Sequence, residues 1–355
     1  MMSEWKTYKL SELVEIKYGK DHKHLADGVI PVYGSGGIMR FAETHLYDRE
    51  SILIPRKGTL SNLFYLDKPF WSVDTMFYTK IKNGVHGKYL YYLLKSMDLA
   101  SMNVGSAVPS LTTEVLNKVE ISLPDLPTQR QIAQILTSLD DKIELNLQMN
   151  QTLEAMAQAI FKEWFVDFNF PGFDGELVDG LPKGWRKGNL GEMISFKNGK
   201  TSPERNNDFQ YPVYGSNGII GYSENFNAVE NISIVGRVGS FCGSTYLSTK
   251  KCWVTDNAII AQSINDYSIF TYLTLLNLNL NNFRAGSGQP LLNQTILSAI
   301  PLNIPSPELL EEFENQTMPF FKKIELNLDT NKQLEDIRNT ALPKLMSGNI
   351  EVMNT

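Results

Sequence analysis

The sequence predicts a mixed α/β fold built twice, because one series of motifs recurs along the chain at a constant distance. The segment Pro31–Ile38 (PVYGSGGI) returns as Pro212–Ile219 (PVYGSNGI), and the hexapeptide KIELNL at Lys142–Leu147 returns at Lys323–Leu328. Both pairs are shifted by 181 residues (212 − 31 and 323 − 142), although more than 100 residues separate the two motifs within each half. A constant shift over that span indicates a duplicated unit that presents two similar surfaces.

Composition limits the class of protein. At 355 residues the chain is long enough for two domains with separate cores. Its apolar runs are too short to span a bilayer, and Met1–Trp5 lacks the basic-then-apolar pattern of a signal peptide. Cys242 and Cys252 have no cysteine at the equivalent first-half positions, so neither a disulfide framework nor a metal site is indicated. We therefore expect a cytoplasmic protein that binds no metal and has no membrane segment.

The net charge of −6 is unevenly distributed along the chain. Residues 1–127 carry 15 basic and 14 acidic groups, and residues 185–306 carry 9 basic and 7 acidic groups. The acidity therefore lies in residues 128–184, at −5, and in residues 307–355, at −4. The repeated parts are close to neutral, which permits local basic patches of the kind that bind nucleic acid.

Each repeat begins at a tryptophan, Trp5 or Trp185, and continues with short β-rich runs punctuated by glycine. The runs Ser51–Gly58 and Ile232–Gly239 predict a buried strand that leads into a glycine loop. A core helix and a proline-rich stop follow in both copies. We therefore predict two similar mixed α/β domains, at residues 1–127 and 185–307. A connector is expected at 169–184 and a C-terminal tail at 347–355.

Long helices are predicted after both proline stops, over residues 128–168 and 308–346. The first has no Gly or Pro between Thr128 and Asp167, and apolar residues recur in it at a heptad-like spacing. About 40 helical residues span roughly 60 Å. The second has the same period but contains Pro319, which is expected to kink the helix or delay its start.

Asparagines recur at equivalent places near the middle of the two predicted helices. A buried Asn in a helical seam costs stability but fixes the register of the pair, and centres that coincide suit an antiparallel pair. The alternative is that these side chains are simply exposed to solvent. The candidate register residues are Asn146, Asn150, Asn327 and Asn331.

No catalytic or metal-binding signature is convincing. Asp125 with Asp140–Lys142 superficially resembles a metal-dependent nuclease motif, but the second copy has Phe-Lys-Lys at 321–323. His22 and His24 lack an acidic or cysteine partner at metal-ligand spacing, so they are better interpreted as loop histidines. The sequence therefore indicates a binding protein and not an enzyme.

The glycine loops provide the candidate contact residues. Glycine lets a backbone approach a ligand closely, hydroxyl groups suit phosphates, Arg suits guanine edges, and Asn or Gln suits adenine edges. The bland alternative is that these loops are structural turns. Their tips differ between the copies, as two readers of different sequences require: Gly36 becomes Asn217 and Lys57 becomes Val238. The candidate DNA-contacting residues are Ser35, Gly36, Arg40, Arg56, Lys57, Thr59, Ser106, Ser216, Asn217, Arg237, Ser240, Ser287 and Gln289.

Taken together, the motifs resemble the specificity (S) subunit of type I restriction–modification systems. Beside the doubled PVYGSxGI motif, the resemblance rests on Ile52–Gly58 (ILIPRKG), Leu123–Ala133 (LPDLPTQRQIA), Phe161–Phe168 (FKEWFVDF) and Leu181–Trp185 (LPKGW). It covers nearly the whole chain. Each motif is modest by itself, but their order, doubled around a long helix, is specific.

The resemblance implies two target recognition domains joined by two long antiparallel helices with pseudo-twofold symmetry. Each domain would read one half of a bipartite site in double-stranded DNA. The helices would set the spacing and dock two modification subunits, which bind S-adenosylmethionine and methylate adenine, and a restriction subunit where one exists. The S subunit itself would be non-catalytic and would bind no cofactor.

Two rival functions make different predictions. A coiled-coil scaffold with two protein- or glycan-binding domains would have no affinity for DNA. A self-sufficient DNA methyltransferase or nuclease would need an S-adenosylmethionine or metal motif, and the sequence contains none that we recognise.

Overall fold

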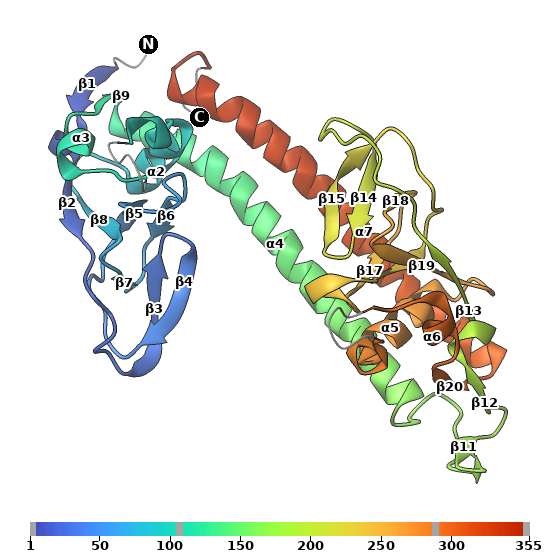
Figure 1. The fold of residues 1–355 in the computed structure, drawn as a ribbon. Helices are drawn as coiled ribbons and strands as arrows, with labels where there is room; N and C mark the ends of the chain where they lie inside the picture. The colour runs from blue at the N-terminus through green and yellow to red at the C-terminus, as the bar shows by residue number, and fades with distance from the viewer. Residues whose placement is uncertain (1–4, 104–108, 286–290, 351–355) are drawn as a thin grey trace. The chain divides into compact units, whose positions relative to one another are not determined.

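The computed structural model describes residues 5–103, 109–285 and 291–350, and it confirms a mixed α/β fold. The chain divides into two compact units. Unit 1 comprises residues 1–144 and 331–355, and unit 2 comprises residues 145–330. Each unit contains one α/β domain and a segment of each of two long helices (Figure 1). We call the two domains domain 1, in unit 1, and domain 2, in unit 2.

Domain 1 contains a four-stranded sheet of order β2-β8-β5-β6, a three-stranded sheet of order β4-β3-β7, and the antiparallel pair β1-β9. Its elements are β1 (Lys6–Lys9), α1 (Leu10–Leu13), β2 (Val14–Tyr18), β3 (Asp27–Gly34), β4 (Gly37–Ala42), β5 (Ser51–Pro55), β6 (Phe64–Leu66), β7 (Trp71–Ser72), β8 (Met76–Ile81), α2 (Gly87–Ser96), η1 (Leu99–Met102), α3 (Thr113–Asn117) and β9 (Glu120–Leu123).

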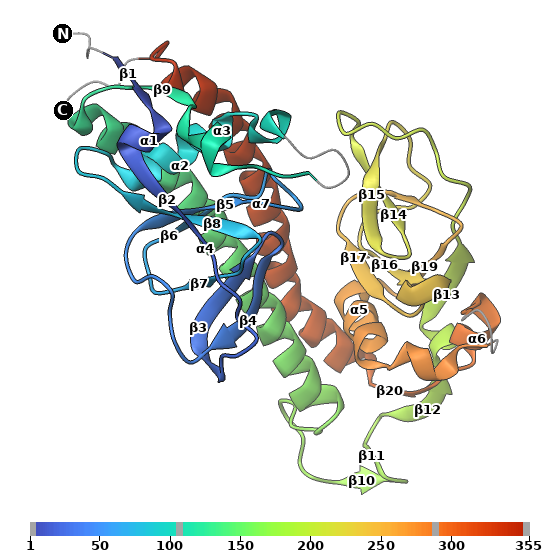
Figure 2. The same cartoon turned by 60° about the vertical axis from the view of Figure 1, so that its left-hand side comes forward.

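Domain 2 repeats this topology strand for strand, with sheets of order β13-β19-β16-β17 and β15-β14-β18 and the pair β12-β20. Its elements are β12 (Arg186–Asn189), η2 (Leu190–Glu192), β13 (Ile194–Asn198), β14 (Tyr211–Gly215), β15 (Gly218–Ser223), β16 (Ile232–Gly236), η3 (Gly239–Phe241), β17 (Thr245–Ser248), β18 (Trp253–Val254), β19 (Ala258–Ser263), α5 (Ser268–Asn277), η4 (Leu280–Phe283), α6 (Gln294–Ser298) and β20 (Pro301–Ile304). The small hairpin β10 (Leu177–Val178) and β11 (Leu181–Pro182) lies in the connector before it (Figure 2).

The predicted buried strands are confirmed as β5 and β16. Every residue of both strands is buried, because apolar clusters cover both faces of the sheet; in β5, for example, Ile52 and Ile54 enter one cluster and Leu53 enters another. An apolar run without alternation is the pattern expected of a strand covered on both faces.

Both long helices are present and each has 40 residues: α4 spans Leu126–Phe165 and α7 spans Pro307–Met346. The expectation that Pro319 delays the start of the second helix is wrong, since α7 begins at Pro307 and is continuous through Pro319. Proline fits the first turn of a helix because the N–H it lacks has no partner there. Pro319 leaves the carbonyl of Asn315 without a helical donor, but both residues are exposed, so water can satisfy that group.

The two helices pack antiparallel within each unit. In unit 1, Arg338 of α7 contacts Asp140 of α4, and Asn331 contacts the carbonyl of Ile143. In unit 2, Asn327 contacts Asn150, while the ring of Phe313, earlier in α7, packs on Phe161, later in α4. In both units the residue number rises along one helix as it falls along the other.

Each domain shares its hydrophobic core with the helices of its own unit. The core of unit 1 includes Ile132 and Leu136 from α4 together with Leu345 and Met346 from α7. The core of unit 2 includes Phe161 and Trp164 from α4 and Leu310 and Phe313 from the first turns of α7. A shared core resists rotation of a domain against its helices, because a packed interior transmits strain.

Candidate nucleic-acid interface

The structure brings the predicted contact loops of domain 1 together. The turn between β3 and β4 holds Ser35, whose carbonyl accepts a hydrogen bond from Asn62 Nδ2 at 2.9 Å. Gly58 lies against the same turn, because a Cβ atom added to it would sit 2.8 Å from Ser35 Oγ. The loop that follows β5 is thereby fixed beside the hairpin turn.

The same loop also joins a third segment. The Arg56 carbonyl accepts a hydrogen bond from Leu111 N at 2.9 Å, and Lys57 forms an isolated bridge with Ser110. The predicted contact residue Ser106 lies outside the described residues. The segment that follows it is nevertheless anchored to the Arg56–Lys57 loop.

Domain 2 repeats this convergence with different side chains. A Cβ atom added to Gly236 would sit 2.8 Å from the carbonyl oxygen of Ser216, in the turn between β14 and β15. The Arg237 carbonyl accepts a hydrogen bond from Leu292 N at 3.0 Å, and Val238 forms a bridge with Leu291. The predicted residues Ser287 and Gln289 lie outside the described residues. Both domains therefore bring equivalent loops to one place.

Arg56 and Arg237 occupy equivalent positions beside these loops. Arg56 Nη1 donates to the carbonyl of Asp74 at 3.2 Å, and Arg237 Nη1 donates to the carbonyl of Asp256 at 3.5 Å. The Arg56 guanidinium also lies 5.3 Å from the ring centroid of Tyr18. Neither arginine has a carboxylate partner within the described ranges. Each site therefore holds a positive charge that is positioned but not neutralised.

The remaining described candidates divide into two groups. Gly36, Lys57, Thr59, Asn217 and Ser240 are exposed on the converging loops. Arg40 differs, because its Nη2 donates to Asp27 Oδ1 at 2.6 Å and to the Leu25 carbonyl at 3.1 Å. The charge of Arg40 is therefore balanced within domain 1.

The four asparagines lie in the seam between α4 and α7. Asn146, Asn327 and Asn331 are 1%, 2% and 5% exposed, so the alternative that they simply face solvent is wrong. Asn327 Nδ2 donates to Asn150 Oδ1 at 2.8 Å, and Asn331 Nδ2 donates to the Ile143 carbonyl at 3.3 Å. These hydrogen bonds suit the predicted register role, which stays a prediction.

Polar contacts between each domain and its helices were not anticipated from sequence. In unit 1 the Asp140 carboxylate accepts hydrogen bonds from Tyr92 Oη at 2.7 Å and from Arg338 Nη1 at 2.6 Å. In unit 2, Tyr272 Oη donates to Glu154 Oε1 at 2.8 Å. The Asp140–Lys142 segment that superficially resembles a nuclease motif thus contributes its first carboxylate to a structural ion pair.

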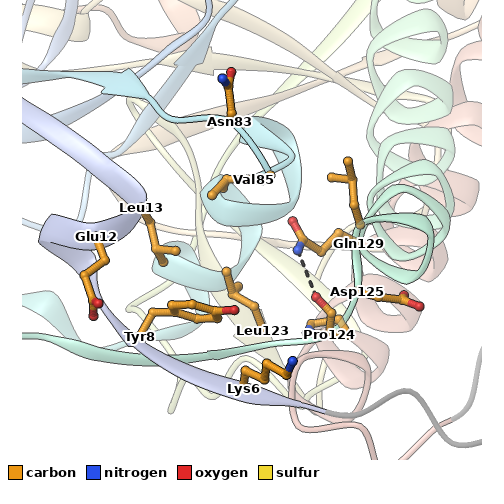
Figure 3. Close-up of a pocket in the computed structure, with 12 residues that line it drawn as sticks. Lys6, Tyr8, Glu12, Leu13, Asn83, Val85, Leu123, Pro124, Asp125 and Gln129 are labelled. Carbon is orange, nitrogen blue, oxygen red and sulfur yellow. Dashed lines mark hydrogen bonds between the residues drawn. The ribbon is translucent and has the colours of Figure 1, made fainter.

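The pocket in Figure 3 lies in domain 1 beside the start of α4 and has a volume of about 660 Å³. Gln129 bridges its wall, because Nε2 donates to the Pro124 carbonyl and Oε1 accepts from His86 N, both at 2.9 Å. The lining shows no pairing of a nucleophile with a base. Over the described ranges, no group of three or more His, Cys, Asp or Glu side chains could hold a metal ion, and no helix has the length and apolarity needed to cross a membrane.

Comparison with known proteins gives the same family for both halves. The model of the type I restriction modification DNA specificity domain matches residues 2–155 and 182–336. The MjaIX specificity subunit of Methanocaldococcus jannaschii is 26% identical over 313 residues, which cover 76% of this chain and 71% of that protein. The HindI specificity subunit of Haemophilus influenzae is 26% identical over 365 residues, with coverages of 76% and 78%.

A solved structure supports the fold independently. The crystal structure of the type I restriction–modification S subunit from M. genitalium aligns with a TM-score of 0.71 over 99% of this chain and 97% of that one, at 17% identity. A likeness at that identity shows the fold, and the doubled family match shows the membership. The chain belongs to the family of type I restriction–modification specificity subunits.

Proposed function

We propose that this chain is the sequence-specific DNA-binding subunit of a type I restriction–modification complex, and that each domain reads one half of a bipartite site. The observation that supports this most directly is the doubled convergence of loops around Arg56 and Arg237. A guanidinium without a carboxylate partner can donate two hydrogen bonds to the O6 and N7 atoms of guanine. The competing scaffold function gains no support from the family match.

Differences between the loops suit two different half-sites. Lys57 in domain 1 corresponds to Val238 in domain 2, and the exposed Gly36 corresponds to Asn217. A lysine adds a phosphate or base contact, whereas valine offers an apolar surface that suits a thymine methyl group. The same loop backbone with different side chains would let each domain recognise a half-site of different sequence.

The helices are proposed to set the gap between the half-sites. Because each domain shares a core with α4 and α7 segments, its contact loops are held at a fixed place along its helices. A helix of 40 residues spans roughly 60 Å, which is sufficient to separate two recognition loops by about one DNA turn of ~34 Å.

The repeated KIELNL motif provides the proposed docking surface for two modification subunits. Leu145 and Leu147 of α4 are 52% and 41% exposed, and Leu326 and Leu328 of α7 are 57% and 52% exposed. Exposed leucines at equivalent repeat positions indicate a protein contact that occurs twice. The modification subunits would bind S-adenosylmethionine and methylate adenine, while this cytoplasmic chain binds no cofactor and performs no chemistry. A restriction subunit would join where the system has one.

The test uses the chain co-purified with its modification subunits. Methylated adenines mapped in DNA exposed to the complex are expected to define a split sequence with a fixed gap. A gel shift at low salt is then expected to show preferential binding to a duplex that carries this sequence. Absence of DNA binding by the assembled complex would contradict the proposal.

A further inference from the structure

In each domain an arginine lies beside the same position of the hairpin that carries the contact turn, but the two arginines come from different places in the chain. The β3–β4 and β14–β15 pairs each contain a register shift at the same place, between Val32 and Tyr33 and between Val213 and Tyr214. Val32 lies opposite Arg40, and the equivalent Val213 lies opposite Gly221. Alignment of the repeats therefore gives domain 2 no arginine at this position.

Arg205, from the segment that precedes β14, fills the place that Gly221 leaves open. A Cβ atom added to Gly221 would lie 3.3 Å from Arg205 Cδ and 3.4 Å from Arg205 Cβ. Arg205 Nη1 donates to the carbonyl of Ile220 at 3.1 Å. In domain 1 the contact runs the other way, from Arg40 on β4 to the Leu25 carbonyl in the segment that precedes β3.

The two arginines differ in how their charge is used. Arg40 pairs with Asp27, and its side chain is 28% exposed. Arg205 is exposed and has no carboxylate partner in the part of the chain that the structure describes. Of these two arginines, Arg205 alone carries a positive charge that no carboxylate in the described residues balances.

The surroundings of Arg205 are polar and fixed to the hairpin. Arg205, Asn206 and Asn207 line a shallow hollow of about 600 Å³, together with Ile220. Asn206 N donates to the Tyr222 carbonyl at 3.0 Å, which ties this segment to β15. Arginine and asparagine are the residue types that hydrogen-bond guanine and adenine edges, and both also bind phosphate.

We propose that Arg205 contacts the DNA of the half-site read by domain 2. This inference rests on the proposed function, and it adds a contact that comparison of the two repeats does not reveal. The acceptor is an oxygen or nitrogen of DNA, from either a base edge or a phosphate. The free face of the guanidinium serves either acceptor, because Nη1 is already held by the Ile220 carbonyl.

The experiment measures binding of the assembled complex to a duplex that carries the mapped split target. Arg205→Ala is expected to weaken binding about tenfold or more, in line with the loss of one directed arginine contact. Arg186→Ala is the matched control, because Arg186 is an exposed arginine of the same domain on β12 that pairs with Glu192. It should change binding less than about twofold, as expected for an exposed pair. Arg40→Ala should have a smaller effect than Arg205→Ala.

Two further measurements identify the acceptor. If Arg205 contacts a phosphate, Arg205→Ala should lower the dependence of binding on salt by about one unit of slope and weaken binding to all duplexes equally. If Arg205 contacts a base, the variant should instead relax recognition at one position of the half-site read by domain 2, which binding to duplexes with single-base substitutions measures. Arg205→Lys should preserve the phosphate contact but not a two-bond contact to guanine.

The outcomes separate this inference from the proposed function. If the wild-type complex does not bind the split duplex, the proposed function fails. If the wild type binds but Arg205→Ala behaves like Arg186→Ala, only the role of Arg205 is overturned. Thermal melting of each variant establishes that it folds. If Arg205→Ala does not fold, comparison of DNA binding by Arg205→Gln and Arg205→Lys tests the role of Arg205 instead.

Discussion

Unit 1 and unit 2 share one topology but attach their domains to the long helices through different polar groups. In unit 1 a neutral side chain of α4, Gln129, accepts the His86 N–H before the first turn of α2. In unit 2 an acidic side chain of α7, Glu314, accepts the Phe270 N–H in the first turn of α5 at 2.8 Å. The duplication has preserved strand order and cores while the polar groups have diverged. Topology and apolar packing are therefore common to both units, and the polar contacts between domain and helix are specific to each.

The largest expected difference between the units is in their response to pH. Burial raises the pKa of the Glu314 carboxyl from its ordinary 4.5 to about 7, although hydrogen bonds from the backbone N–H groups of Phe270 and Ile269 lower it. The folded protein then holds a proton that the unfolded chain releases between these pH values. The associated stability is complete below pH 4.5 and is lost as pH rises through about 7, and its size is on the order of 3 kcal/mol.

Glu314→Gln should remove this dependence, because glutamine keeps the acceptor oxygen and never ionises. The variant and wild type should unfold alike near pH 4.5, and unit 2 of the variant should be more stable above pH 7. Urea denaturation followed by hydrogen exchange in α5 measures the difference. Gln129→Glu is the matched variant in unit 1, where the bond to the Pro124 carbonyl would survive only while the new carboxyl is protonated. Equal pH profiles for Glu314→Gln and wild type would contradict the assignment.

The second comparison concerns the recognition arginines. Arg56→Ala should relax recognition of one half-site only, and Arg237→Ala the other, each with a loss of about 1–3 kcal/mol of discrimination. Each side chain donates a hydrogen bond to a single backbone carbonyl, so its removal should leave the fold intact. Mapped methylation motifs give the readout. A change in both half-sites from either single substitution would show that the domains do not divide the target between them.

The third comparison concerns the carboxylates that join domain to helix. Asp140 accepts hydrogen bonds from two donors, Tyr92 and Arg338, whereas Glu154 accepts one from Tyr272. Asp140→Ala should cost about 1–2 kcal/mol after allowance for the partial exposure of the ion pair, because it leaves a partly buried arginine without its partner. Glu154→Ala should cost less. Hydrogen exchange in α2 and α5 locates each loss, and similar losses in the two helices would argue against the larger role of Asp140.

The sequence predicts some of these features and not others for physical reasons. Periodicity and the fixed repeat shift predict the mixed α/β fold and the helix pair, because burial imposes regular patterns over many residues. Alignment of the repeats identifies the loops at Arg56 and Arg237 as candidates, but their convergence follows from contacts between distant residues that only the structure shows. Arg205 could not be found in that way, because it reaches Gly221 from another part of the chain. Alignment of the repeats does not reveal Glu314 either, since the position aligned with it in the first copy is Ala133.

The smallest expected effect on stability concerns the asparagines of the helix seam, where the two units differ in the partner used. In unit 2, Asn327 donates to the side chain of Asn150, whereas in unit 1 Asn331 donates to a backbone carbonyl. Replacing both Asn150 and Asn327 by leucine should change the free energy of unfolding by less than about 1 kcal/mol and in the stabilising direction, because apolar seams are more stable than polar ones. The consequence should instead appear in specificity, since leucine pairs do not fix one register. Methylation motifs of the double variant should then tolerate more than one gap length. Asn331→Leu alone is the control for unit 1, and an unchanged, single gap length in the double variant would show that the packing of the shared cores is sufficient to fix the register.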